Sequence, residues 1–377
     1  MPDLIERLAT LTRDLVALDS RSFVSNVPIA TRIESELLGF EVERLDYLDA
    51  HGVAKRVLVA HRGGPGGIAF SGHMDTVPDT GWRDDAWSGR IDADGLLHGL
   101  GSTDMKGPVA AAIVAAQDLP TAVPVSLLLT TDEESTKQGA RIIARQSALV
   151  RLAAPWGIVV VEPTSLRPVR GHRASIAFTC VATGVQAHSA SGEGRNANWN
   201  LIPFLAEMKT VFERLRTDTA LQDADYVPPF SDFNVIIDNH GAAFNVTVPI
   251  ATARIKFRYS AKIDPALVRD AVRVAAARCD ITVTEAEEGR PPELPPDHPL
   301  VCLCVDVTGQ SATTVPFGTD ASELQVIASC VVLGPSDIAV AHKPGEAVRL
   351  SHLAAAVPVF QALAMRAAPH NPKGDVT

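Results

Sequence analysis

The order of predicted helices and strands between residues 174 and 289 is the feature that most restricts the fold. The chain there predicts a strand, a long helix, two strands, a second helix and a last strand, at residues 175–182, 200–215, 232–238, 251–259, 265–279 and 281–284. This βαββαβ order is the split βαβ arrangement of a ferredoxin-like domain.

On both sides of residues 174–289, predicted strands and helices alternate in a different order. Strands predicted at residues 56–60, 68–70, 125–130 and 158–161 alternate with helices predicted at residues 4–15, 108–119 and 141–152. Such an alternation is typical of a sheet covered by helices. The proline-rich residues 290–296 mark a boundary, after which helix and strand alternate again. Because 377 residues exceed the ~100–200 of an ordinary domain, we predict an α/β domain, residues 1–173 and 290–377, with residues 174–289 inserted as a second domain.

The composition favours a protein that acts on a small molecule or peptide. Lys and Arg total 34 against 44 Asp and Glu, and a formal charge of −10 repels nucleic acid and anionic membranes. The first residues do not resemble a secretion signal, and the apolar runs fall short of the ~20 residues that span a bilayer. The five cysteines are scattered and form no C-x-x-C pair, so we expect buried thiols in a reducing compartment. We therefore expect a cytoplasmic protein without nucleic-acid or membrane partners.

Histidine and carboxylate side chains follow successive predicted strands. The side chains of His73 and Asp75 point the same way at the end of one strand, so Asp75 can orient the imidazole or share its site. A histidine in such a place is by itself as compatible with a structural role as with a metal. Asp104 lies at the entry to a predicted helix, where an aspartate is more often a helix N-cap than a ligand.

More acids follow the next two strands. Asp132, Glu133 and Glu134 are adjacent, and such acids repel one another at the end of a buried strand unless cations neutralise them, although an exposed loop would tolerate them. Glu162 and then His342 also follow apolar strands, at the sheet edge where open α/β sheets bind ligands. Together these residues predict a metal site, and a mixture of imidazole and carboxylate suits zinc, cobalt or manganese.

These motifs make the chain resemble a known enzyme family over essentially its whole length. It is similar to the zinc aminoacylase and carboxypeptidase family, which includes acetylornithine deacetylase, succinyl-diaminopimelate desuccinylase and glutamate carboxypeptidase. The matching segments are Gly72-His73-Met74-Asp75-Thr76-Val77-Pro78, Gly99 to Gly107, Asp132-Glu133-Glu134, Glu162-Pro163-Thr164 and the closing His342. The resemblance implies a mixed-sheet catalytic domain like that of zinc peptidases, with the ferredoxin-like domain as lid and dimer contact.

The resemblance also implies two divalent metal ions, zinc in preference to cobalt or manganese. Asp104 would bridge the two ions. His73 and Glu162 would hold one ion, and Glu134 and His342 the other.

Catalytic roles follow from the same resemblance. Glu133 would be the general base, and Asp75 would orient the imidazole of the neighbouring ligand. His188 of the inserted domain resembles a histidine that reaches the partner subunit's active site and stabilises the oxyanion. Family members often have a cis peptide bond after the bridging aspartate, so we expect one between Asp104 and Met105.

Four further residues match positions that line the family's substrate pocket. Asn245 and Arg258 would hold a substrate carboxylate, although an isolated arginine on a strand is more often a surface residue. Gly318 and Thr319 belong to a loop that would line the pocket. The chain departs from the acetylornithine deacetylase pattern at residues 237–245 and around Arg258, where the substrate's side chain would lie.

The sequence therefore predicts an amidohydrolase that removes the acyl group from a small N-acyl amino acid, similar to acetylornithine deacetylase. A desuccinylase, or a dipeptidase or carboxypeptidase, would use the same two metals. A protein that kept the fold for binding alone is disfavoured because no ligand or base position is lost. A serine hydrolase is excluded by the lack of a Gly-x-Ser-x-Gly motif.

Overall fold

The computed structural model describes residues 3–368 and divides into two compact units. Unit 1 comprises the chain up to Gly171, Pro292–Thr313 and the chain from Thr319, and unit 2 comprises His172–Pro291 and Thr314–Gly318. The roles of lid and dimer contact for unit 2 stay predictions.

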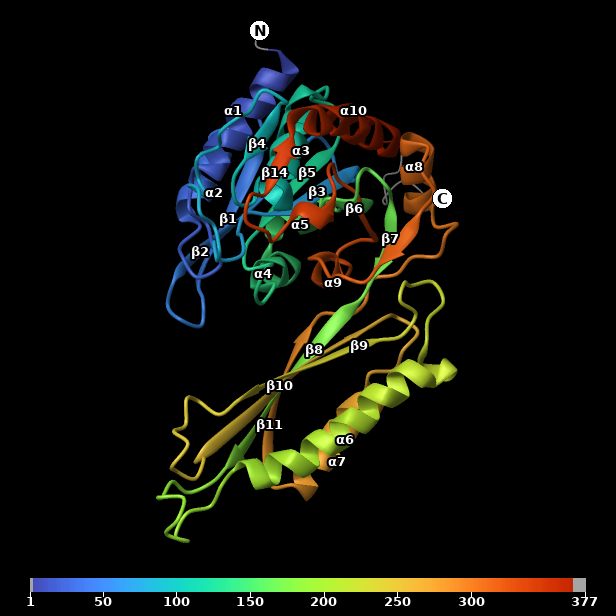
Figure 1. The fold of residues 1–377 in the computed structure, drawn as a ribbon. Coiled ribbons are helices and arrows are strands. Elements are labelled where there is room, and N and C mark those ends of the chain that lie inside the picture. The colour runs from blue at the N-terminus through green and yellow to red at the C-terminus, as the bar shows by residue number, and fades with distance from the viewer. Residues whose placement is uncertain (1–2, 369–377) are drawn as a thin grey trace. The chain divides into compact units, whose positions relative to one another are not determined.

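Unit 1 contains most of an eight-stranded mixed sheet, of which β12 (Thr313–Val315) begins in unit 1 and continues in unit 2 (Figure 1). In spatial order the strands of this sheet are β1 (Glu41–Leu48), β2 (Ala54–Arg62), β5 (Val125–Thr130), β3 (Ile68–His73), β6 (Gly157–Val160), β13 (Cys330–Val332), β7 (Val169–His172) and β12. Strands β5, β3, β6 and β13 run parallel to one another. Strand β1 pairs antiparallel with β2, β2 with β5, and β7 with β13. Every residue of β3 and β5 is buried, as expected for parallel strands covered on both faces. The predicted α/β class is confirmed.

The helices of unit 1 pack around this sheet and against one another. They are α1 (Leu4–Val16), α2 (Val27–Glu34), α3 (Gly107–Asp118), α4 (Gln138–Gln146), α5 (Ala148–Ala153), α8 (Pro299–Thr308), α9 (Ala321–Leu324) and α10 (Leu350–Ala367), with a π-helical turn η1 (Ser102–Lys106) and a 3₁₀ turn η3 (Ile338–Val340). Helices α1, α3 and α10 contact one another in the main hydrophobic core. A small sheet pairs β4 (Leu96–His98) with β14 (Ala347–Arg349).

One predicted helix of unit 1 needs correction, and one long apolar helix was not predicted. The single helix predicted at residues 141–152 is two helices, because the Ser147 backbone is extended and its hydroxyl accepts a hydrogen bond from the Val150 N–H as the cap of α5. Helix α10 is long and apolar enough to cross a membrane by length and composition, which the short apolar runs did not predict. Its residues Phe360 and Leu363 are fully buried in the core, so it is packed as a core helix.

Unit 2 has the predicted ferredoxin-like order. Its elements are β8 (Ala174–Thr183), α6 (Asn198–Thr217), a 3₁₀ turn η2 (Thr219–Leu221), β9 (Asp232–Asp238), β10 (Ile250–Tyr259), α7 (Ala266–Arg278) and β11 (Ile281–Glu288). The sheet is antiparallel in the order β11-β8-β10-β9, with α6 and α7 alongside it (Figure 1). Alternate residues of β8 and β10, such as Phe178 and Phe257, fill a separate hydrophobic core with side chains of both helices. Strand β9 lies at the sheet edge.

Candidate metal centre

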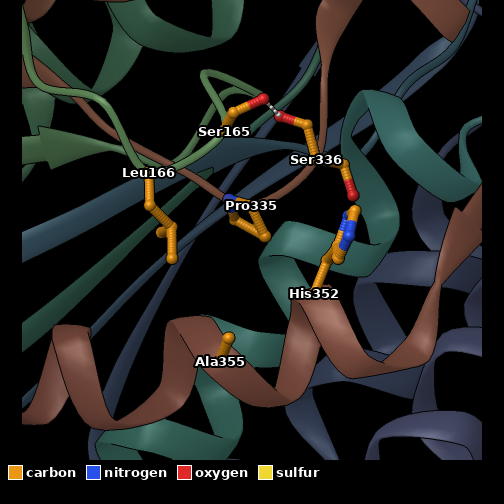
Figure 2. Close-up of a pocket in the computed structure, with 6 residues that line it drawn as sticks. All are labelled: Ser165, Leu166, Pro335, Ser336, His352 and Ala355. Atoms are coloured by element: carbon orange, nitrogen blue, oxygen red, sulfur yellow. Dashed lines mark hydrogen bonds between the residues drawn. The ribbon is translucent and has the colours of Figure 1, made fainter.

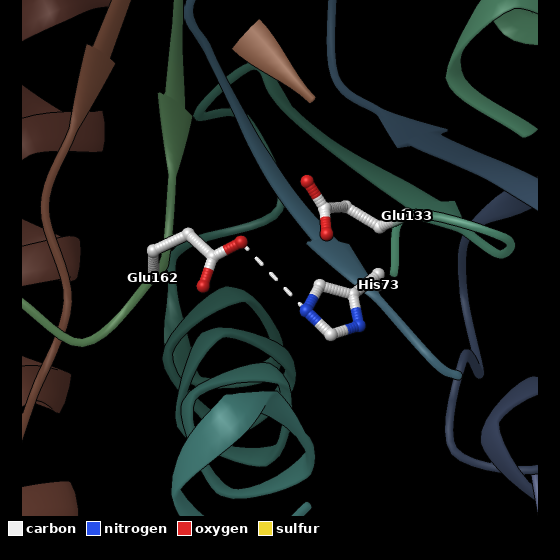
Figure 3. Close-up of side chains that lie close together, drawn as sticks. All are labelled: His73, Glu133 and Glu162. Atoms are coloured by element: carbon white, nitrogen blue, oxygen red, sulfur yellow. Dashed lines mark ion pairs between the residues drawn. The ribbon is translucent and has the colours of Figure 1, made fainter. Parts of the chain in front are cut away.

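The predicted metal ligands of unit 1 come together at the carboxyl ends of β3, β5 and β6. His73 is the last residue of β3, and its Nε2 lies 3.1 Å from Asp104 Oδ1 and 3.7 Å from Glu162 Oε1. Figure 3 shows the Glu162 and Glu133 carboxylates near the His73 ring. His73, Asp104 and Glu162 are at most 5% exposed. Since these strands run parallel, their ends meet at one edge of the sheet, as the sequence pattern predicted.

Asp104 contacts both histidines, one with each carboxylate oxygen. Its Oδ2 lies 3.1 Å from Nε2 of His342, whereas its Oδ1 faces His73. His342 Nε2 is also 2.9 Å from Glu134 Oε1, and the His342 side chain is half exposed. Asp104 lies in the η1 turn, and the expected cis peptide bond between Asp104 and Met105 is confirmed. The aspartate is therefore placed between two groups of possible ligands, and its side chain caps no helix.

Burial and close packing perturb the acids of this cluster. Burial, with the neighbouring charge of Asp104, raises the pKa of Glu162 well above its usual value, and burial raises the pKa of Glu134 to about 7. Burial would also raise the pKa of Asp104, but hydrogen bonds with His342 and His73 outweigh it and hold that pKa low. Hydrogen bonds to Asp104 and Glu134 raise the pKa of His342 to about 11. Glu134 and Glu162 therefore need further positive charge beside them to be ionised, which divalent cations would supply.

The donor set fits divalent metal ions. Two groups of ligand atoms each lie within 4.8 Å of one another, one formed by His73, Glu133 and Glu162 and the other by His73, Asp104 and Glu134. Imidazole nitrogens combined with carboxylate oxygens are typical ligands of zinc and similar transition metals.

Asp75 connects the His73 strand to the turn that carries the two glutamates. It is fully buried, and its carboxylate accepts hydrogen bonds from the backbone N–H groups of Glu133 (3.2 Å) and Glu134 (3.3 Å) and from the Ser22 hydroxyl (2.7 Å). The main-chain carbonyl oxygen of Asp75 lies 2.9 Å from His73 Nδ1, closer than the Asp75 carboxylate, which is 3.6 Å away. Asp75 can therefore fix the orientation of His73 mainly through its main chain.

Glu133 lies beside this cluster with a cation that the sequence did not single out. Its side chain is 9% exposed, and Nζ of Lys137 lies 3.5 Å from its Oε1. Burial raises the pKa of Glu133, against the effect of the Lys137 charge. Lys137 also donates a hydrogen bond to the Thr319 carbonyl at 2.9 Å. Lys137 is four residues after Glu133 in the sequence, which is the only signal that could have indicated the pair.

Asp132, the first of the three adjacent acids, has structural partners. Its carboxylate accepts a hydrogen bond from the Tyr47 hydroxyl at 2.6 Å and lies 2.9 Å from Nζ of Lys55. Tyr47 and Lys55 are cross-strand neighbours on β1 and β2, and the Lys55 side chain is fully buried. Lys55 also donates to the carbonyls of Ser22 and Val24. This network holds the residue before Glu133 in a left-handed conformation (φ 61°).

Lys55→Met should lower the free energy of unfolding of unit 1 by about 3–5 kcal/mol, because it leaves the buried Asp132 carboxylate without its cation. Urea unfolding followed by circular dichroism measures the change. Arg56→Met is the matched control on the same strand, since Arg56 pairs with Asp46, whose side chain is 57% exposed, and should cost about 1 kcal/mol or less. Equal losses in the two variants would contradict the structural role of the Lys55 network.

The predicted residues of unit 2 fall into two groups. His188 and Asn245 are exposed and lie on adjacent segments, since His188 bridges to Val246 and the Ser189 N–H donates to the Asn245 carbonyl at 3.0 Å. Arg258 is near the far end of β10, where it forms an ion pair with Asp232. Arg258 follows Ile250 by eight positions along the strand, which corresponds to about 26 Å at ~3.3 Å per residue. Within one chain, Arg258 therefore does not join His188 and Asn245.

The loop of Gly318 and Thr319 crosses from unit 2 to unit 1. Thr319 is fully buried, and its hydroxyl accepts a hydrogen bond from the Ala321 N–H. The Thr319 side chain therefore faces the interior in this structure. Its main-chain carbonyl accepts the hydrogen bond from Lys137, which lies near Glu133.

Two hollows of unit 1 differ in their relation to the candidate site. A cavity of about 720 Å³ includes Glu134 in its wall, together with apolar side chains such as Phe23, Leu48, Val77 and Pro78. A smaller hollow of about 150 Å³ contains no predicted site residue, and its walls are Ser165, Leu166, Pro335, Ser336, His352 and Ala355 (Figure 2). Of these two hollows, the larger is therefore the one that lies next to a predicted metal ligand.

Comparison with known proteins identifies the family. Residues 69–366 match the model of peptidase family M20/M25/M40. The chain belongs to this family. It is 31% identical to an acetylornithine deacetylase of Myxococcus xanthus over an alignment 379 positions long. The alignment covers 94% of this chain and 95% of the relative.

Two solved structures illustrate how widely the fold is shared. A tripeptidase from Staphylococcus aureus matches with a TM-score of 0.72 and 18% identity, covering 96% of this chain and 99% of the other. A dinuclear metal-binding M20 peptidase from Bacillus subtilis matches with a TM-score of 0.64 and 15% identity, covering 97% and 99%. The predicted family and fold are confirmed, and the protein is a metallohydrolase of this family that acts on amide bonds.

Proposed function

We propose that this protein is a zinc-dependent amidohydrolase that removes the acyl group from a small N-acyl amino acid. The observation that carries the proposal is the position of Asp104, whose two oxygens face His73 and His342. In this proposal His73 and Glu162 would hold one divalent ion, Glu134 and His342 would hold the other, and Asp104 would be a ligand shared by both. The mixed nitrogen and oxygen donors favour zinc, with cobalt and manganese as substitutes.

Two bound cations would polarise the scissile carbonyl and make a water molecule acidic enough to attack at neutral pH. Glu133 is proposed to take a proton from the attacking water and to pass it to the leaving amine. Its burial and raised pKa suit this exchange, and its hydrogen-bonded neighbour Asp75 fixes its main chain. The Lys137 ammonium, 3.5 Å from Glu133 Oε1, favours the ionised carboxylate and partly opposes the rise in its pKa that burial causes.

The substrate assignment is supported by both the relatives and the cavity beside Glu134. The Myxococcus xanthus protein of 31% identity is an acetylornithine deacetylase. The apolar part of the cavity wall, which includes Phe23 and Leu48, would receive one side of the scissile amide. Its 720 Å³ would also accept a longer acyl group or an amino-acid residue, so a desuccinylase or dipeptidase is the second candidate.

A substrate panel tests this proposal. Purified zinc-loaded protein should release free amine from N-acetyl amino acids, with N-acetylornithine hydrolysed fastest, and chelation should stop the release. Faster release from N-succinyl amino acids or simple dipeptides would replace the substrate and keep the chemistry. No chelator-sensitive release from any N-acyl amino acid or dipeptide would contradict the proposal.

We also propose a homodimer formed through unit 2. Strand β9 is an edge strand with exposed Ile236 (56%) and Ile237 (54%), and such an edge can pair with a second copy. The ~26 Å along β10 separates Arg258 from the end that carries His188 and Asn245. One substrate could contact Arg258 and His188 together only if the two residues came from different chains. His188 of the partner subunit would then stabilise the oxyanion.

Mixing two inactive variants tests the contribution of His188. His188→Ala and Asp104→Asn should each abolish most turnover, the former without loss of metal. Dimers re-formed from an equal mixture should recover about a quarter of wild-type activity, because half of the dimers are mixed and each mixed dimer has one complete site. No recovery in verified mixed dimers would show that His188 does not act across subunits.

The proposed location is the cytoplasm. All five cysteines are free thiols, which suits a reducing compartment. The expectation that all of them are buried is wrong, because Cys302 is exposed and Cys279 is only partly buried.

A further inference from the structure

Glu346 closes the turn that carries Asp104. Its Oε1 accepts hydrogen bonds from the backbone N–H groups of Thr103 (2.7 Å) and Asp104 (3.0 Å), and its Oε2 accepts one from Gly101 (3.0 Å). The main-chain carbonyl of Glu346 accepts a fourth hydrogen bond, from the Gly99 N–H at 3.0 Å. One residue therefore holds the main chain of this segment at four points.

The Asp104 turn requires such a partner because its backbone departs from helical geometry. Asp104 has φ −122° and ψ 91°, and Met105 has φ −137° and ψ 32°. The N–H groups at the start of a helical turn have no carbonyl partner within that turn, and here the Glu346 carboxylate accepts hydrogen bonds from three of them, those of Gly101, Thr103 and Asp104. Glu346 is 2% exposed, so water cannot readily replace it, and buried N–H groups without an acceptor are unfavourable.

The same short segment also carries His342, which contacts the other oxygen of Asp104. Glu346 follows His342 by four residues and donates its own N–H to the Lys343 carbonyl at 3.1 Å. Directly after Glu346, strand β14 pairs with β4, and the Ala347 carbonyl accepts a hydrogen bond from the Thr103 hydroxyl at 3.0 Å. The segment is therefore fastened to both sides of the Asp104 turn.

We propose that Glu346 is a positioning residue of the metal centre. By holding the Asp104 turn against the His342 segment, it sets the Asp104 carboxylate between His73 and His342. The inference rests on the proposed role of Asp104 as the bridging ligand. It makes Glu346 a determinant of metal affinity without direct contact with metal or substrate.

Metal binding of a Glu346→Gln variant tests this inference. The amide keeps one acceptor oxygen but directs an NH₂ group at a backbone donor, so zinc affinity should fall about 10–100-fold, measured by competition with a chromophoric chelator. The visible spectrum of the cobalt-substituted protein should also change, because the ligands of the cobalt ions shift. Glu346→Ala should have the larger effect, and if it does not fold, Glu346→Gln carries the test.

Glu43→Gln is the matched control. The Glu43 carboxylate accepts hydrogen bonds from the backbone N–H groups of Ala148 (2.9 Å) and Leu149 (3.2 Å) at the start of α5, in a comparable way but outside the metal centre. This variant should keep wild-type zinc affinity and cobalt spectrum even if it loses stability. An equal loss of zinc affinity in Glu43→Gln would show that the loss in Glu346→Gln comes from lower general stability. That result would overturn the inference.

An Asp104→Asn variant, measured in parallel, separates the inference from the function on which it rests. Loss of metal from Asp104→Asn, with wild-type affinity and spectrum in Glu346→Gln, would overturn the positioning role alone. Full metal binding by Asp104→Asn would overturn the bridging site and the positioning role together. Reduced affinity in both variants, with the control unchanged, supports the inference.

Discussion

Glu133→Gln is expected to lower kcat by about 10²–10⁴-fold while the protein keeps its full metal content. The substitution preserves the shape of the side chain and removes its ability to accept a proton from the attacking water. Glu133 is 9% exposed beside His73 and Glu162, and its pKa is raised, so a neutral amide should fit there without disturbing the fold. Steady-state kinetics together with metal analysis of the same preparation measure both quantities.

Glu134→Gln is the contrasting variant at the next position. Glu134 Oε1 lies 2.9 Å from His342 Nε2, so its substitution should lower metal content along with activity. A Glu133→Gln enzyme with wild-type kcat would contradict the role of general base. Loss of metal from Glu133→Gln would instead make Glu133 a ligand, which its proximity to His73 and Glu162 would allow.

Replacing Asp104 by asparagine should have the second large effect, a drop in metal content from two ions to at most one and a loss of activity of at least about 10³-fold. The asparagine amide has one acceptor oxygen, whereas the aspartate carboxylate has two, so asparagine cannot bind both metal ions in the same way. The contacts to His73 and His342, at 3.1 Å each, are the ones affected. Elemental analysis after gel filtration measures the bound metal.

Asp306→Asn provides the control for this variant, because Asp306 is a surface residue with 62% of its side chain exposed. It should keep both metal content and activity. Zinc at about 1,000 times its Kd should also stabilise the wild-type protein by roughly 4 kcal/mol, and this gain should shrink in Asp104→Asn. An Asp104→Asn protein with two ions and normal turnover would refute the bridging role.

The comparison of sequence and structure is clearest in unit 2. The βαββαβ order was predictable because strand and helix patterns are local properties, and the strand predicted at residues 232–238 is β9 without any change of bounds. The single helix predicted at residues 141–152 was wrong because one serine side chain, Ser147, ends one helix and caps the next. A hydrogen bond of this kind outweighs helical periodicity over one turn.

The candidate site divides in a similar way. His73, Asp104, Glu134, Glu162 and His342 were predictable because each follows a recognisable core strand or motif, and the structure brings them within 3.7 Å of a neighbour in the group. Lys55, Lys137 and Glu346 were not predicted as parts of the site. Glu346 receives hydrogen bonds from residues about 245 positions earlier in the chain, and no local pattern encodes such a contact.

The sequence by itself determined the fold class, the order of elements and the residue types that can bind metal, because these depend on local periodicity and on the chemistry of side chains. Only the tertiary structure decided which atoms meet. It divided three adjacent acids between separate tasks, since Asp132 pairs with Lys55 while Glu134 meets His342. It also placed the Glu346 carboxylate where it accepts hydrogen bonds from the N–H groups of Thr103 and Asp104. These outcomes depend on how buried polar groups from distant segments satisfy one another, which is settled only when the whole core packs.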